Sequence, residues 1–232
     1  MFTPVPNTKK LLQKASAPAW VNNTFQSSGK VVLPPSSTPE EQEVLVWTGG
    51  FTHGCYGSEL PCVRSCGVVN MSALKLMELL VDSGRAGEYN KYLIARTDIM
   101  TFQDDMTMPG AFGKSVTKVM KTEVQPPMVR KSMEFVSVLH AKELEDGSGY
   151  LIVTRAVHTP EHSSPSAMAS SSLRSEILMG VNLIRKIQGA EHSKCLMVNV
   201  NHLKSPSVPM FIAKKLGLSS AVNFVNDIRG CC

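Results

Sequence analysis

The stretch from residue 133 to residue 230 constrains the fold of this chain more than any other. It alternates between strand-like runs and turns, and it ends in an amphipathic segment with helical periodicity. A sheet with one terminal helix across it encloses an apolar cavity, and groups suited to catalysis are few here, which favours a lipid carrier over an enzyme. We expect strands at about 133–144, 149–158, 173–186 and 192–204, and a helix at about 209–229.

The upstream half adds further strands and a helix. Residues 44–70 read as two or three short strands, and strands resume at 92–102 and 116–124. Between them, apolar residues at helical spacing predict a helix: Leu74, Met77, Leu80 and Val81.

This order of elements predicts an α+β chain with the helix-grip architecture. In that architecture a curved antiparallel β-sheet wraps on a long C-terminal α-helix and encloses an internal apolar cavity. We expect an N-terminal arm at residues 1–42 that is partly disordered or helical, one lipid-binding domain at 43–230, and a Cys-Cys tail at 231–232.

Composition argues against several functions. Lys and Arg number 24 against 19 Asp and Glu, and they are spread along the chain, so we expect no nucleic-acid partner. The N-terminus lacks the apolar core of a secretory signal and no run is long enough to span a bilayer, which predicts a cytoplasmic protein. The six cysteines form no disulfide framework, and only Cys62 and Cys66 approach metal-site spacing. We therefore expect no metal and no cofactor.

Short motifs along the chain resemble those of a known family, in the same order. They are residues 79–90, Met-Glu-Phe-Val at 133–136, Leu-Arg-Ser-Glu at 173–176, Asn-His-Leu-Lys-Ser at 201–205 and Phe-Val-Asn-Asp-Ile-Arg at 224–229. On these motifs, residues 44–230 resemble the START domain, the lipid-transfer domain related to the steroidogenic acute regulatory protein.

The resemblance implies non-covalent binding of one hydrophobic lipid, such as a sterol or phospholipid, and its transfer between membranes. The C-terminal helix would gate the tunnel together with loops 126–132 and 161–172. The implied partners are the lipid and, transiently, a membrane surface, and we expect a monomer. The family's motif arginine, often part of a buried charged pair at the ligand head group, is Met133 here. The tunnel is therefore expected to be more apolar at one end.

We expect ligand contacts from four polar and six apolar side chains. A buried Arg174 would need a carboxylate or a lipid head group as its partner, whereas on an outward strand face it would simply be hydrated. The methionines suit a deformable pocket wall or, equally, an ordinary core. The polar candidates are Glu123, Glu134, His158 and Arg174, and the apolar ones are Met133, Met179, Met197, Phe211, Leu218 and Val222.

Two other functions stay open. An enzyme on the same fold, such as a cyclase or hydrolase, would need a carboxylate and His158 to converge in the cavity, and the sequence has no Gly-x-Ser-x-Gly elbow. A module that senses a lipid and regulates a partner protein is the third reading. The terminal Cys231 and Cys232 fit a geranylgeranyl acceptor pair, a palmitoylation site or unmodified thiols.

Overall fold

The structure is a computed structural model that describes residues 21–26, 38–49, 62–104, 114–127, 129–157, 172–205 and 208–231. The helices are α2 (Pro39–Gln42), α3 (Ala73–Val81), α4 (Ala86–Tyr89) and α5 (Met210–Arg229). The strands are β1 (Val21–Gln26), β2 (Glu43–Gly49), β3 (Cys62–Val69), β4 (Leu93–Asp104), β5 (Ser115–Val124), β6 (Met133–Glu143), β7 (Gly149–Ala156), β8 (Leu173–Arg174), β9 (Glu176–Lys186) and β10 (Cys195–Lys204).

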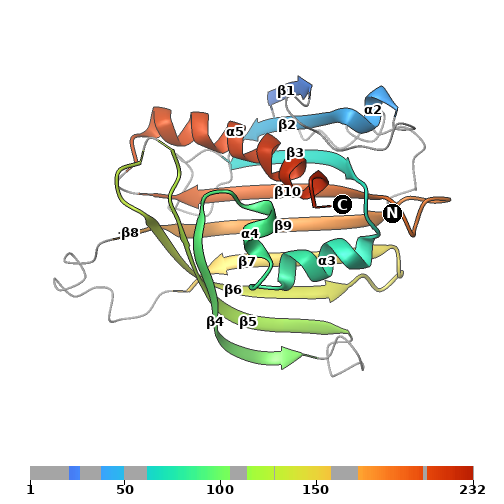
Figure 1. Ribbon diagram of the computed structural model, residues 1–232, viewed down its shortest axis with the longest axis horizontal. Coiled ribbons are helices and arrows are strands. Elements are labelled where there is room, and N and C mark those ends of the chain that lie inside the picture. The colour runs from blue at the N-terminus through green and yellow to red at the C-terminus, as the bar shows by residue number, and fades with distance from the viewer. Residues whose placement is uncertain are drawn as a thin grey trace.

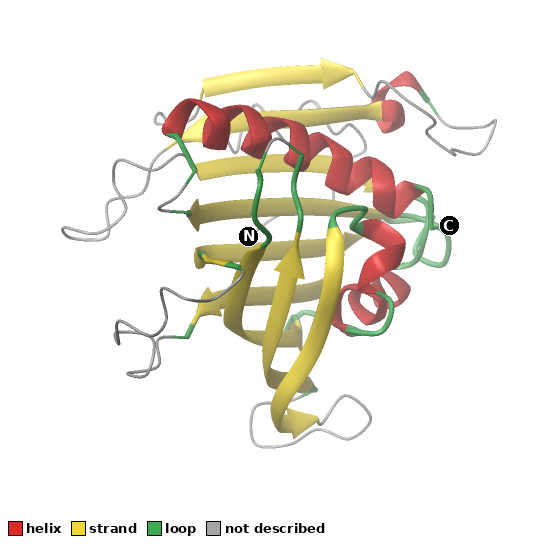
Figure 2. Ribbon diagram, turned by 60° about the vertical axis from the view of Figure 1, so that its left-hand side comes forward, coloured by secondary structure: helices red, strands yellow, loops and turns green. Residues whose placement is uncertain are grey.

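The strands form one curved sheet with the order β1-β2-β3-β10-β9-β7-β6-β5-β4, and every neighbouring pair in this row is antiparallel. α5, α3 and α4 all lie on the same face of the sheet (Figure 1), and the sheet curves around them (Figure 2). The predicted α+β helix-grip fold is confirmed.

Alternation along the strands decides which side chains face the helices. On β6 the residues Met133, Phe135, Ser137, Leu139 and Ala141 are buried, while those between them are half-buried. Ser72 caps the N-terminus of α3, because its hydroxyl accepts a hydrogen bond from the Lys75 amide. The helix buries its apolar stripe against β7 and β9. The main core therefore lies between the concave face of the sheet and the helices.

Two details differ from the expected strands. The run at 173–186 is broken at Ser175, because the amides of Leu173 and Ser175 bond to β6 and hold β8 parallel to it, while β9 runs between β10 and β7. β1 lies within the expected N-terminal arm and pairs with β2. The boundaries proposed at 42/43 and 230/231 stay a prediction.

The C-terminal end of α5 is fixed to the sheet by Arg229, which is fully buried. Its guanidinium donates hydrogen bonds of 2.6–3.1 Å to backbone carbonyls at the α2–β2 junction and at the end of β3, and to the Asn226 side chain. The carbonyls belong to Glu41, Gln42, Glu43 and Val68. One side chain thus joins segments some 160 to 190 residues apart along the sequence.

Gly67 allows α5 to approach β3 closely at the same end. A Cβ atom on Gly67 would lie 2.8 Å from Val225 Cγ1 and 3.3 Å from Arg229 Nη2. Val225 is fully buried and β-branched, so it has little freedom to move aside. The bare backbone of Gly67 is therefore part of the helix–sheet contact.

We expect Arg229→Met to lower the free energy of unfolding by more than about 3 kcal/mol, because it leaves several buried carbonyls without donors. Arg85→Met is the matched control, since Arg85 is exposed and pairs with Glu88 on the surface. Urea denaturation followed by circular dichroism gives both values. An Arg229→Met midpoint equal to that of the wild type would show that the anchor contributes nothing.

We expect Gly67→Ala to cost about 1–3 kcal/mol of unfolding free energy through overpacking against Val225. Gly87→Ala, in the short α4 helix, is the control: a Cβ there meets nothing within 4 Å, so the change should be neutral or stabilising. Thermal denaturation of the two alanine variants separates a steric effect at Gly67 from a general effect of glycine replacement.

Candidate functional site

A pocket of about 300 Å³ lies between α5 and the sheet. Its walls come from α5, β3, β6, β10, the end of β5 and the α4–β4 turn. The side chains that line the pocket are mainly apolar, and most of the polar ones lie near the α4–β4 turn and on α5. The residues that line it are Val63, Tyr89, Asn90, Lys91, Tyr92, Val124, Pro126, Met133, Phe135, Asn201, Leu203, Ser205, Val208, Met210, Ala213, Leu216, Gly217, Ser220, Ala221, Asn223, Phe224 and Asp227.

α5 turns one face to the pocket and the next to the core. Ala213, Gly217, Ser220 and Phe224 follow each other at helical spacing along the pocket wall. The core face consists of Ala221, Val222, Val225 and Ile228, which are buried near the C-terminal end. α5 therefore roofs the pocket along its length, from Met210 to Asp227, while its buried core residues are confined to the C-terminal half.

The sheet supplies the apolar floor. Met133 and Phe135 point to the pocket because they alternate with outward residues on β6. Gly217 brings the helix close to β3, since a Cβ on it would lie 3.3 Å from Val63 Cγ2. The floor and roof are thus in near contact at this point.

An ion pair between Lys91 and Asp227 ties the α4–β4 turn to α5 at the edge of the pocket. The hydrogen bond to Asp227 and the carboxylate's charge raise the pKa of Lys91. Because Lys91 is well exposed, solvent weakens this ion pair, which therefore contributes little to holding α5 in place.

Tyr89 places a hydrogen-bonded hydroxyl group beside the pocket. Its ring lines the pocket and packs edge-on against Phe224, at a centroid distance of 5.9 Å. Its hydroxyl accepts a hydrogen bond of 2.8 Å from Arg96 Nη1, which also donates to the Leu80 carbonyl at 3.1 Å. Burial raises the pKa of Tyr89 and outweighs the opposing charge of Arg96, so the phenol stays neutral.

A second cation, Lys118, lies on the same face of the sheet and is neutralised. Only 5% of Lys118 is exposed, and its Nζ donates to Asp98 Oδ2 and to the Val81 carbonyl, both at 2.7 Å. Burial acts to raise the pKa of Asp98, but hydrogen bonds from Lys118 and Ser83 lower it on balance. This pair joins β4 and β5 to the end of α3 as a structural unit.

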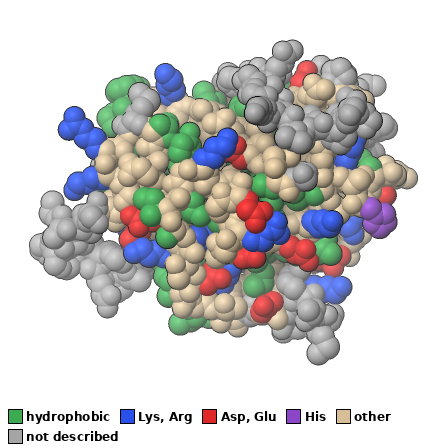
Figure 3. All heavy atoms as spheres, viewed as in Figure 1, with side chains coloured by type: hydrophobic (Ala, Val, Ile, Leu, Met, Phe, Trp, Pro, Cys, Tyr) green, Lys and Arg blue, Asp and Glu red, His purple; other side chains and the backbone are tan. Residues whose placement is uncertain are grey.

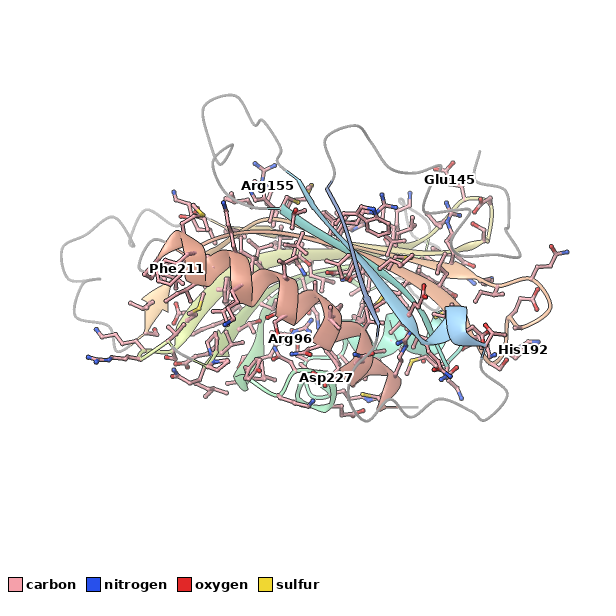
Figure 4. All side chains as sticks on the ribbon, turned by 90° about the horizontal axis from the view of Figure 1, so that it is seen from above. Arg96, Glu145, Arg155, His192, Phe211 and Asp227 are labelled. Carbon is pink, nitrogen blue, oxygen red and sulfur yellow. The ribbon has the colours of Figure 1, made fainter. Side chains whose placement is uncertain are left out.

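Among the predicted apolar contacts, Met133 lines the pocket. Met197 and Val222 are buried in the main core, and Leu218 packs against it. Phe211 is 74% exposed at the start of α5 (Figure 4). Contact of these four with a ligand stays a prediction.

The predicted polar contacts form a separate group. Glu134, next to Met133 and so on the opposite face of β6, pairs with Lys121 at 2.7 Å and with Arg174 at 3.6 Å. Glu123 accepts a hydrogen bond from Ser132. None of these residues lines the pocket, and their ligand role stays a prediction.

The remaining two predicted ligand contacts are Met179 and His158. Met179 is half-buried on β9, opposite His202 of β10, and is not part of the pocket wall. His158 lies outside the described residues, as does most of the expected gating loop 161–172.

Several residues that line the pocket were not predicted as ligand contacts, although the spacing of apolar residues in the sequence could have indicated them. Phe135 follows Met133 at strand spacing, and Gly217 and Phe224 follow Met210 at helical spacing. Tyr89 stood in a quoted motif without an assigned role. Asn201 likewise stood in a motif, at 201–205, without an assigned role, because its place in the wall depends on β10 lying under α5.

The described part of the chain contains no group of three or more His, Cys, Asp or Glu side chains placed to hold a metal ion. Burial raises the pKa of the Cys62 and Cys66 thiols to about 12, which disfavours the reactive thiolate. Within the described residues, no helix is both long and apolar enough to cross a bilayer.

The surface over the helices carries no single dominant charge. On the face seen in Figure 3, Lys and Arg side chains are interspersed with Asp and Glu, and apolar side chains lie between them. Exposed Met210 and Phe211 stand at the start of α5, beside the pocket.

Comparison with solved structures gives the same fold. Human StAR-related lipid transfer protein 5 is similar at 14% identity, with a TM-score of 0.68, over 96% of this chain and 90% of that one. Human STARD10 is similar at 14% identity and a TM-score of 0.63, over 97% and 80%. The human StarD13 (DLC2) lipid transfer and protein localization domain is similar at 13% identity and a TM-score of 0.62, over 95% and 92%.

Comparison with curated protein sequences finds no match. The family comparison covers nearly the whole chain, because the START domain matches residues 9–232. The curved sheet, the C-terminal helix across it and the pocket between them agree with that match. The chain therefore belongs to the START domain family.

Proposed function

We propose that this protein binds one hydrophobic lipid non-covalently beneath α5 and carries it between membranes. The observation that supports this most directly is the mainly apolar pocket between α5 and the sheet. Burial of lipid chain is worth about 0.8 kcal/mol per CH₂ group, which drives uptake without a covalent step. The solved lipid transfer proteins of the same fold support the same class of function.

The N-terminal half of α5 is the proposed gate. Pockets for ligands of this kind span about 300–1,000 Å³, so the pocket is at the small end and a large lipid needs the roof to move. Met210 and Phe211 are exposed, whereas Val225, Ile228 and Arg229 are fully buried. The helix is therefore held at its C-terminal end and has few buried contacts at the other, which favours opening at Met210.

A carrier is favoured over an enzyme by the pocket's ionisable groups. Among the residues lining it, Lys91 and Asp227 already pair with each other, and Tyr89 is held by Arg96. General acid–base chemistry needs such groups to be available to a substrate. The proposal includes a cytoplasmic monomer that contacts membranes transiently, with exposed Met210 and Phe211 entering the bilayer surface.

We expect Ala213→Trp to reduce lipid transfer between vesicles by roughly tenfold, because the indole fills the pocket from the roof. Ser219→Trp, at an exposed position of the same helix, is the matched control and should transfer normally. The measurement is loss of a labelled lipid from donor vesicles of mixed sterol and phospholipid.

Native mass spectrometry of the wild type complements this assay. One lipid per chain after incubation with the same vesicles is the expected result. A chain that stays free of lipid and transfers none would overturn the carrier proposal and favour the enzyme on the same fold.

A further inference from the structure

Most of the chain's excess positive charge lies in two short segments. Arg130 and Lys131 belong to the loop between β5 and β6, and Lys214 and Lys215 belong to the start of α5; all four residues are exposed. Lys and Arg exceed Asp and Glu by five in the whole sequence, 24 against 19, and these four residues account for four of that excess. The rest of the chain is therefore nearly neutral.

The two segments meet at one edge of the pocket. Pro126 of the loop lines the pocket together with Met210 and Ala213 of α5, and the loop reaches the helix in both ribbon views (Figure 1, Figure 2). At the left-hand end of Figure 3, where α5 begins, Lys and Arg side chains lie beside apolar ones. The two pairs of cations therefore flank the same pocket edge, although they come from distant parts of the sequence.

Carboxylates are missing from the segments that carry these cations. The sequence has no Asp or Glu from residue 124 to residue 133, or from residue 205 to residue 226. Glu134, the first carboxylate beyond the loop, already pairs with Lys121 at 2.7 Å. Within the described residues, none of the four cations forms an ion pair. An anionic partner would therefore meet four cations without an opposing charge among them.

Exposed apolar side chains stand among the cations. Phe211 is 74% exposed, and Met210 beside it is 38% exposed. Lys214 and Lys215 follow Phe211 by one helical turn, so the three share one exposed side of α5. Basic residues next to exposed aromatic and aliphatic ones are typical of helices that lie in the interface of an anionic membrane.

We propose that these residues form a docking surface for an anionic bilayer. Its cations are Arg130, Lys131, Lys214 and Lys215, and its apolar members are Met210 and Phe211. The inference rests on the proposed carrier function, because a lipid that enters beneath α5 has to come from a bilayer at the pocket's edge. The docking surface adds to that function the class of membrane that is served and the orientation in which the protein binds it.

Electrostatic attraction of this size is enough to select a membrane. The surface potential of anionic lipids strengthens binding by about fivefold for each Lys or Arg close to the surface, so four cations give roughly several hundredfold. The potential falls off within about 10 Å at 0.1 M salt, so cations on other faces of the protein contribute little. The pocket edge that carries the four cations therefore faces the bilayer.

The first test compares binding to vesicles of phosphatidylcholine alone with binding to vesicles in which about a third of the lipid is phosphatidylserine, measured by co-flotation. We expect the wild type to prefer the anionic vesicles by more than about a hundredfold. Lys214→Gln combined with Lys215→Gln should lower binding to the anionic vesicles by roughly 25-fold, and so should Arg130→Gln combined with Lys131→Gln. Binding to phosphatidylcholine should not change in either variant.

Two controls separate charge from its position and from apolar contact. Lys75→Gln combined with Arg155→Gln removes the same charge from exposed positions on α3 and β7, and should change binding by less than about twofold. Phe211→Ala should weaken binding to both kinds of vesicle by the same factor and keep the preference, because insertion of an apolar side chain does not depend on the charge of the lipid.

The second test needs no variant. Raising the salt concentration to about 1 M shortens the screening length to about 3 Å, so the wild type should then bind the two kinds of vesicle alike. A preference for phosphatidylserine that persists at high salt would overturn the docking surface, because it would come from recognition of the head group itself.

The outcomes also separate this inference from the carrier function. Equal binding of the wild type to both kinds of vesicle, with lipid transfer between them intact, would overturn the docking surface and leave the carrier. A strong preference for anionic vesicles that the two double variants lose, without uptake of lipid from either kind, would overturn the carrier and leave a protein that binds anionic membranes.

Discussion

The hydrogen bonds of Arg229 are the constraint on which the rest of the structure depends. A fully buried guanidinium joins the last turn of α5 to carbonyls of the α2–β2 junction and of β3, and Gly67 leaves room for it. With this end held, α5 lies across the sheet without a comparable anchor at Met210. The pocket runs along α5 from Met210 to Asp227, and the buried residues of the helix lie towards Arg229, so its C-terminal end is the better held of the two.

Two cations, Lys118 and Arg96, lie on the concave face of the sheet and are bonded within the fold. Lys118 is saturated by Asp98, Ser83 and the Val81 carbonyl, and it fixes α3 against β4 and β5. Arg96 is bonded to Tyr89 and Leu80 but retains one buried donor.

Much of the fold could be predicted from the sequence, because the apolar residues of its strands and helices recur at regular spacing. Alternation predicted β6, and helical spacing predicted α3 and α5, since a half-buried element repeats its apolar face at its own period. The site was less readable. Met133 was predicted and lines the pocket, whereas Met197 of β10 and Val222 of α5 are buried in the core. For Val222 the reason is that α5 has two adjacent apolar faces, and periodicity does not tell which one covers a cavity.

The sequence by itself determined the element order, the strand faces, the closing helix and the family, because these follow from hydrophobic period and motif order. Only the tertiary structure decided which polar groups face the pocket. Glu134 and Arg174 pair with each other and do not line the pocket, whereas Tyr89 of α4 lines it and is hydrogen-bonded to Arg96 of β4. The partner of a buried charge depends on which strands and helices become neighbours, and that is set by packing over distances that local patterns do not encode.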